Sequence, residues 1–384
     1  MLCAGLSTFA LLYCTQPLLP LFSRDFGLNA EEASLAVSLT TGPMAIMILV
    51  AGMLSDHVGR RPLMIGSLFL SAALTLLLGF LPGWHSLLAI RFLCGLLLAG
   101  VPAVAMAFIS EEVEDQAVSQ AMGLYVAGSA VGGMSGRLLV SIVTQYLGWR
   151  MALGATGLAA LLIALLFWRL LPPSRQFLPQ RHSIGSYLTG FGRLMSDKAL
   201  PWLFLESFLL MGAFISVYNY VGFRLLAPPY SLSQVAVGAI FILYLAGSVS
   251  SALAGSAASR FGPRKTLWLP MILFLIGIAL TTAQSLAIVI LGIGVVTIGF
   301  FGGHAIASAW VGRRARQNRA QATAAYLFAY YMGSSILGSV GGYAWTHARW
   351  LGVSAFAGTL MLIGIAVAAH LARILPLPPA PDAD

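Results

Sequence analysis

Three ionisable side chains lie deep within long apolar stretches of this sequence, and they are its first candidates for chemistry: Arg91, Arg137 and Glu206. A charge at the centre of a bilayer costs at least about 2.5–3.5 kcal/mol on insertion scales, so such a residue normally faces a cavity and has a partner. A carboxyl group shielded from water can bind and release a proton near neutral pH. The sequence therefore predicts Glu206 as a proton carrier with Arg91 or Arg137 beside it. A static buried pair is the alternative.

Polar and aromatic residues in other apolar stretches could line a binding cavity. Aromatic walls with few polar groups suit small, partly apolar ligands, and Tyr326 and Tyr330 are four residues apart, which places them on one helix face. Aromatic residues near the end of a stretch, notably Tyr218, equally fit a belt at the membrane interface. His304 could shuttle protons, but a packed, hydrogen-bonded histidine is the more common case. The candidate cavity residues are Tyr13, Gln16, Thr40, Thr41, Asn219, Tyr244, Tyr326 and Tyr330.

The composition indicates that lipid surrounds most of the chain. Hydrophobic residues make up 59% and charged residues only 9%, whereas soluble domains carry about 25% charged residues. The net charge of +9 does not by itself indicate nucleic acid, because basic residues flank the cytoplasmic ends of membrane helices. Cys3, Cys14 and Cys94 lie in apolar runs, and neither a disulfide framework nor a metal site fits their number and spacing. No cofactor and no metal are expected.

Twelve apolar segments are long enough to cross a bilayer, since a spanning helix needs about 20 residues. The first is interpreted as a span, because it has neither the basic leader nor the cleavage pattern of a signal peptide. The chain starts inside this span, which is compatible with a missing amino-terminal stretch or with a misassigned start. The predicted spans are 2–22, 33–54, 62–81, 86–109, 118–141, 149–171, 199–222, 233–257, 266–284, 286–310, 321–343 and 349–371.

The long connection 172–198 divides these spans into two groups of six. We expect an amino-terminal six-helix bundle over residues 1–171, a cytoplasmic linker over 172–198, a carboxy-terminal six-helix bundle over 199–373 and a cytoplasmic tail over 374–384. With the amino terminus inside, the outer side holds only four of the 21 Lys and Arg residues: Arg24, Arg150, Arg224 and Arg349. Because basic residues gather on the inner side, both termini are predicted to be cytoplasmic.

The two halves carry similar patterns. Residues 52–61 follow the second predicted span and residues 255–265 follow the eighth, and the two stretches share glycines and basic residues. Gly132 in the first half has a counterpart, Gly333, in the second. Two such repeats in the same orientation are a known plan of transporters, which bind substrate near the midplane between the repeats.

The loop 52–61 resembles the signature of the major facilitator superfamily between its second and third helices. That signature has a glycine, a leucine, an aspartate, a second glycine and two basic residues. Ser259 and Pro263 depart from it in the second copy, which implies that the gate is strongest in the first half. The matching residues are Gly52, Leu54, Asp56, Gly59, Arg60 and Arg61.

Two further stretches resemble the drug and sugar efflux members of the bacterial inner membrane, including proteins described as arabinose exporters. Arg91, followed by Gly95, is similar to their fourth-helix motif, whose arginine is implicated in proton coupling. The glycines within 128–136 resemble the fifth-helix motif of antiporters, although Arg137 replaces its last glycine. Close helix packing explains these glycines equally well.

The resemblance implies an all-α integral membrane protein with twelve transmembrane helices in two pseudo-symmetric bundles. It implies that Asp56 latches the inside-closed state through charge-assisted hydrogen bonds to loop arginines. Glu111 and Glu112 are possible partners of Arg60 or Arg61, and a solvated acidic loop is the alternative. The implied function is proton-coupled efflux, by antiport, of a small molecule such as a drug, sugar or metabolite. Uptake by symport or facilitated diffusion is the alternative on the same scaffold.

The expected partners are the small-molecule substrate, protons and the lipid bilayer, with no nucleic acid, and the chain is expected to act as a monomer in the bacterial inner (plasma) membrane. A membrane-embedded enzyme is the rival of a different class. It would need converging Asp, His, Cys or Ser side chains near a membrane face. The sequence has no HExxH motif, no GxSxG motif and no histidine cluster, so no enzyme activity is predicted.

Overall fold

The computed structural model describes residues 1–174, 176, 184–315 and 318–375, and every regular element in these ranges is a helix. The predicted linker 172–198 and tail 374–384 therefore lie partly outside the described residues. The helices are α1 (Leu2–Tyr13), η1 (Gln16–Leu18), α2 (Leu19–Phe26), α3 (Ala30–Val58), α4 (Arg60–Leu77), α5 (Trp84–Leu98), α6 (Ala105–Glu112), α7 (Asp115–Leu170), α8 (Ile184–Ser196), α9 (Leu200–Leu226), α10 (Gln234–Ala239), η2 (Ile240–Leu243), α11 (Tyr244–Phe261), α12 (Pro263–Thr266), α13 (Trp268–Thr281), α14 (Leu286–Arg314) and α15 (Arg319–Arg373).

Local sequence explains where these helices begin and end. Asn29 starts α3 by accepting a hydrogen bond from the backbone of Glu32, whose side chain accepts one in return from the backbone of Asn29; this capping box satisfies two free N–H groups of the helix end. Gly59 and Gly262 adopt φ angles of 92° and 86°, which a side chain would disfavour. These two glycines separate α3 from α4 and α11 from α12, at equivalent points of the two halves.

Nine segments of the described chain are long and apolar enough to cross a membrane, and two of them have 55 residues. A straight helix of that length would measure about 80 Å, more than twice the thickness of a hydrocarbon core. Both bend near the middle: α7 at Gly148 and α15 at Ala348 and Arg349, where φ and ψ leave the helical region. Each can therefore supply two crossings, and with α5 and α6 the described helices are consistent with the predicted twelve-helix architecture.

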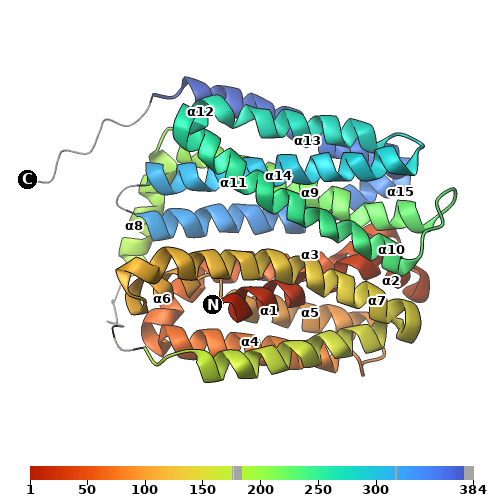
Figure 1. Ribbon diagram of the computed structural model, residues 1–384, viewed down its shortest axis with the longest axis horizontal. Coiled ribbons are helices and arrows are strands. Elements are labelled where there is room, and N and C mark those ends of the chain that lie inside the picture. Colours follow the sequence, from red (N-terminus) through yellow and green to blue (C-terminus); the bar gives the residue numbers. More distant parts are fainter. Residues whose placement is uncertain (175, 177–183, 316–317, 376–384) are drawn as a thin grey trace, which may run out of the picture.

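The helices before and after α8 form two groups (Figure 1). In the first group α1 and α4 pack on α7, and α3 packs on α5; in the second, α9 packs on α15 and α14 packs on α11 and α13. Contacts between the groups involve mainly α3 with α15 and α7 with α10. Apolar side chains such as Leu70, Val131 and Leu253 are exposed on the outer faces, as expected of a surface that meets lipid.

Glycines allow the closest helix contacts inside each group. A Cβ atom on Gly132 of α7 would lie 2.2 Å from the carbonyl oxygen of Leu6 on α1, and one on Gly128 would lie 2.3 Å from that of Leu2. Gly333, the predicted counterpart of Gly132, has the same relation to Phe208 of α9, at 2.2 Å. The packing interpretation of these glycines is confirmed, and the two halves use it at equivalent positions.

Candidate functional site

The two ends of the helix bundle differ in chemistry. We call the end that holds the Gly59 and Gly262 turns the basic end, because Arg60, Arg264 and Arg314 lie there; α6, α8 and α12 mark it on the left of Figure 1. α2 and α10 lie towards the other end, which we call the opposite end. The candidate residues lie at the basic end and between the two ends.

Hydrogen bonds join the two helix groups at and towards the opposite end. The hydroxyl oxygens of Ser38 on α3 and Ser339 on α15 are 2.7 Å apart. Gln234 at the start of α10 donates to the carbonyl oxygen of Pro17 at 2.7 Å, and the backbone N–H of Val235 donates to the side chain of Gln145 on α7 at 2.9 Å. The groups are therefore held together on this side of the molecule.

At the basic end each described ion pair stays within one helix group. Arg60 contacts Glu111 through two nitrogen–oxygen pairs, both at 2.5 Å, so the predicted Arg60–Glu111 pairing is confirmed. Asp56 lies 3.8 Å from Arg60, and Arg60 also donates to the hydroxyl of Ser55 at 3.0 Å. Arg61 donates to the carbonyl oxygen of Leu171 at 3.2 Å. The signature thus forms a charged cluster on the first group alone.

The remaining signature residues add no charged side chain to this cluster. Gly59 forms the turn between α3 and α4. Leu54 is exposed, and a Cβ atom on Gly52 would meet no atom within 4 Å. The close packing that explains Gly132 therefore does not explain Gly52.

The second group has an ion pair that sequence reasoning missed. Asp197, just before α9, accepts hydrogen bonds from the Arg314 side chain at 3.0 Å and from the backbone N–H groups of Ala199 and Leu200 at 2.8 and 3.0 Å. Partial burial by itself raises the pKa of Asp197, but these hydrogen bonds outweigh it and hold the pKa below its ordinary value. An aspartate shortly before a long apolar helix was the available signal.

Arg91 is fully buried, and each of its three guanidinium nitrogens donates to a backbone carbonyl group. Its guanidinium donates to the backbone oxygens of Leu11, Leu12 and Ala36 at 2.9, 2.5 and 3.0 Å. It therefore ties α5 to α1 and α3. The described contacts of Arg91 include no carboxylate.

Arg137 lies among the predicted cavity residues. Its guanidinium donates to the side-chain oxygen of Gln16 and to the carbonyl oxygen of Gly133, both at 2.6 Å. It also stands over the rings of Tyr13, Phe241 and Tyr244, at 4.3, 4.9 and 5.2 Å from their centroids. Such contacts stabilise a cation away from water. The sequence did not predict Phe241 as a cavity residue, because nothing in its apolar surroundings distinguishes it from a residue that only packs in the core.

Gln16 connects Arg137 to the second helix group. Its side-chain nitrogen donates to the side-chain oxygen of Asn219 on α9 at 2.7 Å. Gln16 and Asn219 are both about 1% exposed. The chain Arg137–Gln16–Asn219 is thus a buried polar link between the two groups.

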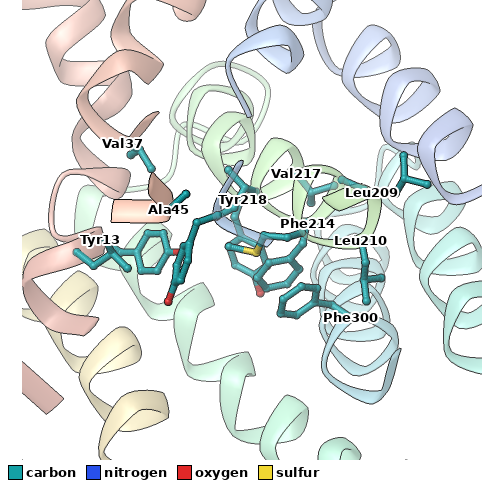
Figure 2. Packing of buried hydrophobic residues seen from close by; sticks show 14 of the residues in the cluster. Tyr13, Val37, Ala45, Leu209, Leu210, Phe214, Val217, Tyr218 and Phe300 are labelled. Carbon is teal, nitrogen blue, oxygen red and sulfur yellow. The ribbon is translucent and has the colours of Figure 1, made fainter. Parts of the chain in front are cut away.

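An aromatic cluster continues from this link towards α14. Figure 2 shows Tyr13 of α1 facing the aromatic side chains that α9 and α14 contribute. The rings of Phe214 and Phe300 stack with centroids 3.7 Å apart. Tyr218 is buried and shares a hydrogen bond with Thr297 at 2.7 Å, so the interfacial-belt alternative for Tyr218 is wrong.

His304 and the two tyrosines of α15 form one cluster. The Tyr326 hydroxyl is 2.9 Å from Nδ1 of His304, and the Tyr330 ring centroid is 4.9 Å from that of His304. The packed, hydrogen-bonded alternative therefore describes His304. Thr40 and Thr41 of α3 are both buried; the Thr41 hydroxyl reaches only backbone oxygens of its own helix, and the Thr40 backbone packs against Gly95 of α5.

Glu206 is fully buried on α9, and neither of its carboxyl oxygens has a hydrogen-bond partner among the described residues. A Cβ atom on Gly364 of α15 would lie 3.0 Å from one of these oxygens and 3.9 Å from the sulfur of Met271 on α13. The carboxyl group thus points towards α13 and α15. Neither Arg91 nor Arg137 pairs with Glu206 as expected, because the described hydrogen bonds of both arginines go to other groups.

Comparison with known proteins identifies the family. The family model of the Major Facilitator Superfamily matches residues 1–241. The chain belongs to this superfamily. It is 41% identical over 375 residues to the uncharacterised MFS-type transporter YybF of Bacillus subtilis (strain 168), which covers 98% of this chain and 93% of the relative. It is 42% identical to the inner membrane transport protein YnfM of Escherichia coli (strain K12), covering 97% of this chain and 89% of the relative.

Solved structures of other transporters share the fold of this superfamily member. A bacterial homologue of the human lysosomal transporter Spinster, inward-facing and occupied, aligns with a TM-score of 0.76 at 14% identity and covers 96% of this chain and 95% of that chain. The nucleoside transporter NupG aligns with a TM-score of 0.75 at 15% identity and covers 97% of both. Its family and its transporter relatives make this superfamily member a multi-pass membrane transport protein and not an enzyme.

Proposed function

We propose that this superfamily member is a proton-coupled antiporter that exports a small molecule, such as a drug, sugar or metabolite, across the bacterial plasma membrane. The observation that carries the proposal is the Glu206 carboxyl group, which is fully buried and has no described partner. An ionised carboxylate is costly there, so the neutral, protonated form of Glu206 is favoured in this conformation. In another conformation that exposes the carboxyl group to water, Glu206 can release the proton. We assign the coupling role to Glu206 alone, since Arg91 and Arg137 bind other groups.

The arrangement of contacts supports alternating access with the basic end in the cytoplasm. Basic residues favour the cytoplasmic side, and the described hydrogen bonds between the helix groups lie at and towards the opposite end. We propose that residues 1–171 and 199–373 form two bundles that rock relative to one another across the interface that contains Gln16 and Asn219. In this account both termini are cytoplasmic and the described conformation is closed to the outside.

A disulfide across the opposite end should stop transport. Ser38 and Ser339 contact each other through their hydroxyls at 2.7 Å, so Ser38→Cys combined with Ser339→Cys brings two thiols within reach of a disulfide. Oxidation is expected to abolish transport by locking the outer side, and a reducing agent should restore it. Each single variant and the wild type, treated with the same oxidant, control for Cys3, Cys14 and Cys94. Full transport by the cross-linked double variant would show that this end does not need to open.

The Asp56 cluster should matter in the opposite conformation. Asp56 lies 3.8 Å from Arg60, which is too far for a hydrogen bond. The Asp56 carboxylate is therefore available to accept one when the basic end closes. Losing a charge-assisted hydrogen bond that forms only in that state would shift the equilibrium about tenfold or more. Asp56→Asn is therefore expected to slow transport to that extent at an unchanged protein level in the membrane. The exposed Glu114→Gln is the control. Equal transport rates in the two variants would remove Asp56 from the gate.

The direction and coupling are tested in everted membrane vesicles. Cells with and without the protein, challenged with a panel of radiolabelled or toxic compounds, first identify a substrate. Vesicles with an acidified lumen are then expected to accumulate that substrate, and a protonophore should prevent accumulation. Accumulation driven by an acidic outside medium would favour uptake by symport, and a flux that ignores the protonophore would favour facilitated diffusion.

A further inference from the structure

Arg137 is a buried cation whose described contacts are all uncharged. It is 2% exposed, and its described partners are an amide, a backbone carbonyl and three aromatic rings. No carboxylate of the described residues lies within ion-pair distance of it. Charged groups inside a membrane protein pair with one another or with backbone carbonyls, and they mark substrate and ion pathways. Among the described residues no negative charge offsets Arg137, which lies where the two halves meet.

Three polar groups near Arg137 also lack a hydrogen-bond partner in the part of the chain that the structure describes. The hydroxyls of Tyr13 and Tyr244 and the side-chain nitrogen of Asn219 are buried without a hydrogen bond among the described residues. The two tyrosine rings lie against the Arg137 guanidinium, and Asn219 is joined to it through Gln16. Buried polar groups are nearly always hydrogen-bonded, so each orphan needs an explanation. All three can donate a hydrogen bond, which together with the cation is the complement of an anion.

We propose that Arg137 binds the carboxylate of the substrate, and that this substrate is a small organic monocarboxylate with an aromatic or otherwise apolar body. The inference rests on the proposed function only in treating the chain as a transporter of small molecules. One cation stands among these donors, and one cation matches one negative charge. Arg91 is not assigned to this site, because each of its three guanidinium nitrogens already donates to a backbone carbonyl of the first helix group.

The apolar body of the ligand is assigned from the rings beside the cation. Tyr13, Phe241 and Tyr244 surround Arg137, and Phe214 and Phe300 continue the aromatic surface. Flat or compact apolar groups pack well against such walls. A sugar, which offers hydroxyls on every side, would leave many of its own groups without partners here.

In the described conformation the Gln16 side chain occupies the position on Arg137 that we assign to the substrate carboxylate. Its amide oxygen accepts from Arg137 at 2.6 Å while its nitrogen donates to Asn219 at 2.7 Å. Because Arg137 and Asn219 belong to different halves, separation of the halves must break this link. A carboxylate can take two parallel hydrogen bonds from a guanidinium where an amide oxygen takes one. The ligand thus replaces an internal contact when the site opens.

Matched ligand pairs test the charge requirement. The purified full-length protein in lipid nanodiscs is titrated with benzoate, phenylacetate and indole-3-acetate and with the primary amide of each, and binding is followed by thermal shift. At least one carboxylate is expected to bind about tenfold or more tightly than its amide, the difference that a charge-assisted hydrogen bond makes. Phenyl phosphate, with its second charge, should bind more weakly than that carboxylate. Equal binding of acids and amides, no binding of any acid, or tighter binding of phenyl phosphate overturns the proposal.

Variants assign the effect to Arg137. Arg137→Gln should abolish the preference for the acid, and Arg137→Lys should keep part of it. Arg150→Gln, at an exposed arginine that donates to the Pro82 carbonyl, should keep all of it. A preference that survives in Arg137→Gln overturns the assignment. If that variant does not fold, Tyr13→Phe replaces it, and an unchanged acid affinity in Tyr13→Phe counts against the site.

Failure of this inference and failure of proton coupling give different results, because binding needs no gradient. A carboxylate preference with transport that ignores a protonophore would refute only the coupling. Proton-driven transport of an uncharged compound that Arg137→Gln still carries would refute only the anion site.

Discussion

Adding a single carbon atom at Gly132 is expected to destabilise the transporter severely. In Gly132→Ala the new Cβ would lie 2.2 Å from the Leu6 carbonyl oxygen and 2.6 Å from the Leu6 Cα. Both atoms belong to the backbone, so no side-chain rotation relieves the contact and α1 must move away from α7. Overpacking of this kind typically costs about 1–3 kcal/mol, occasionally more. We expect most of the variant to be lost from the membrane, and the remainder to unfold at a clearly lower temperature.

A control on the same helix isolates the contact. A Cβ atom on Gly123 of α7 would meet no atom within 4 Å, and alanine is the better helix former by about 1 kcal/mol. Gly123→Ala should therefore be neutral or slightly stabilising. Membrane protein levels and the thermal stability of the detergent-purified variants provide the measurement. If Gly132→Ala matched Gly123→Ala in both, the close approach of α1 and α7 would not be a requirement of the fold.

The helical architecture was predictable because its signal is local. Apolar length alone located the membrane segments, and turns at Gly59 and Gly262 fall where the sequence pattern placed the breaks. Departures follow from local chemistry too. The predicted span 86–109 is interrupted between α5 and α6, at Pro102, which lacks the backbone N–H that a continuous helix requires. The predicted span 233–257 contains the 3-10 turn η2, for which the sequence shows no breaking residue.

The candidate site was predictable only as a set of residue types. Buried charges stand out against apolar sequence, so Arg137 and Glu206 could be selected, but their neighbours depend on how segments far apart in the chain pack. Arg91 or Arg137 was expected beside Glu206, yet the contacts of Arg137 come from α1, η1, η2 and α11. The ion pair of Asp197 was not predicted, because its partner Arg314 is 117 residues away in the sequence. Pairing of this kind is a property of tertiary structure, which a single sequence does not encode locally.

Removing the titratable group of Glu206 is expected to abolish uphill transport. Glutamine has almost the same shape as the protonated side chain, so Glu206→Gln should fit beside Gly364 and Met271 and leave the fold intact. It cannot release a proton, however, and an antiporter must change the charge of one group in each cycle. We expect no substrate accumulation in vesicles with an imposed proton gradient. Exchange of labelled for unlabelled substrate, which needs only the conformational change, should continue at a rate close to that of the wild type.

The contrast between the two assays makes this result specific to coupling. A variant that misfolds, or that cannot change conformation, loses accumulation and exchange together, whereas Glu206→Gln should lose accumulation alone. Glu114→Gln removes a carboxylate from an exposed position and should behave as the wild type in both assays. Gradient-driven accumulation that persists in Glu206→Gln would move the coupling site to another group. Asp56 and His304 would be the next to test, because Asp56 is a carboxylate beside the proposed gate and His304 is an imidazole hydrogen-bonded to Tyr326 within the second helix group.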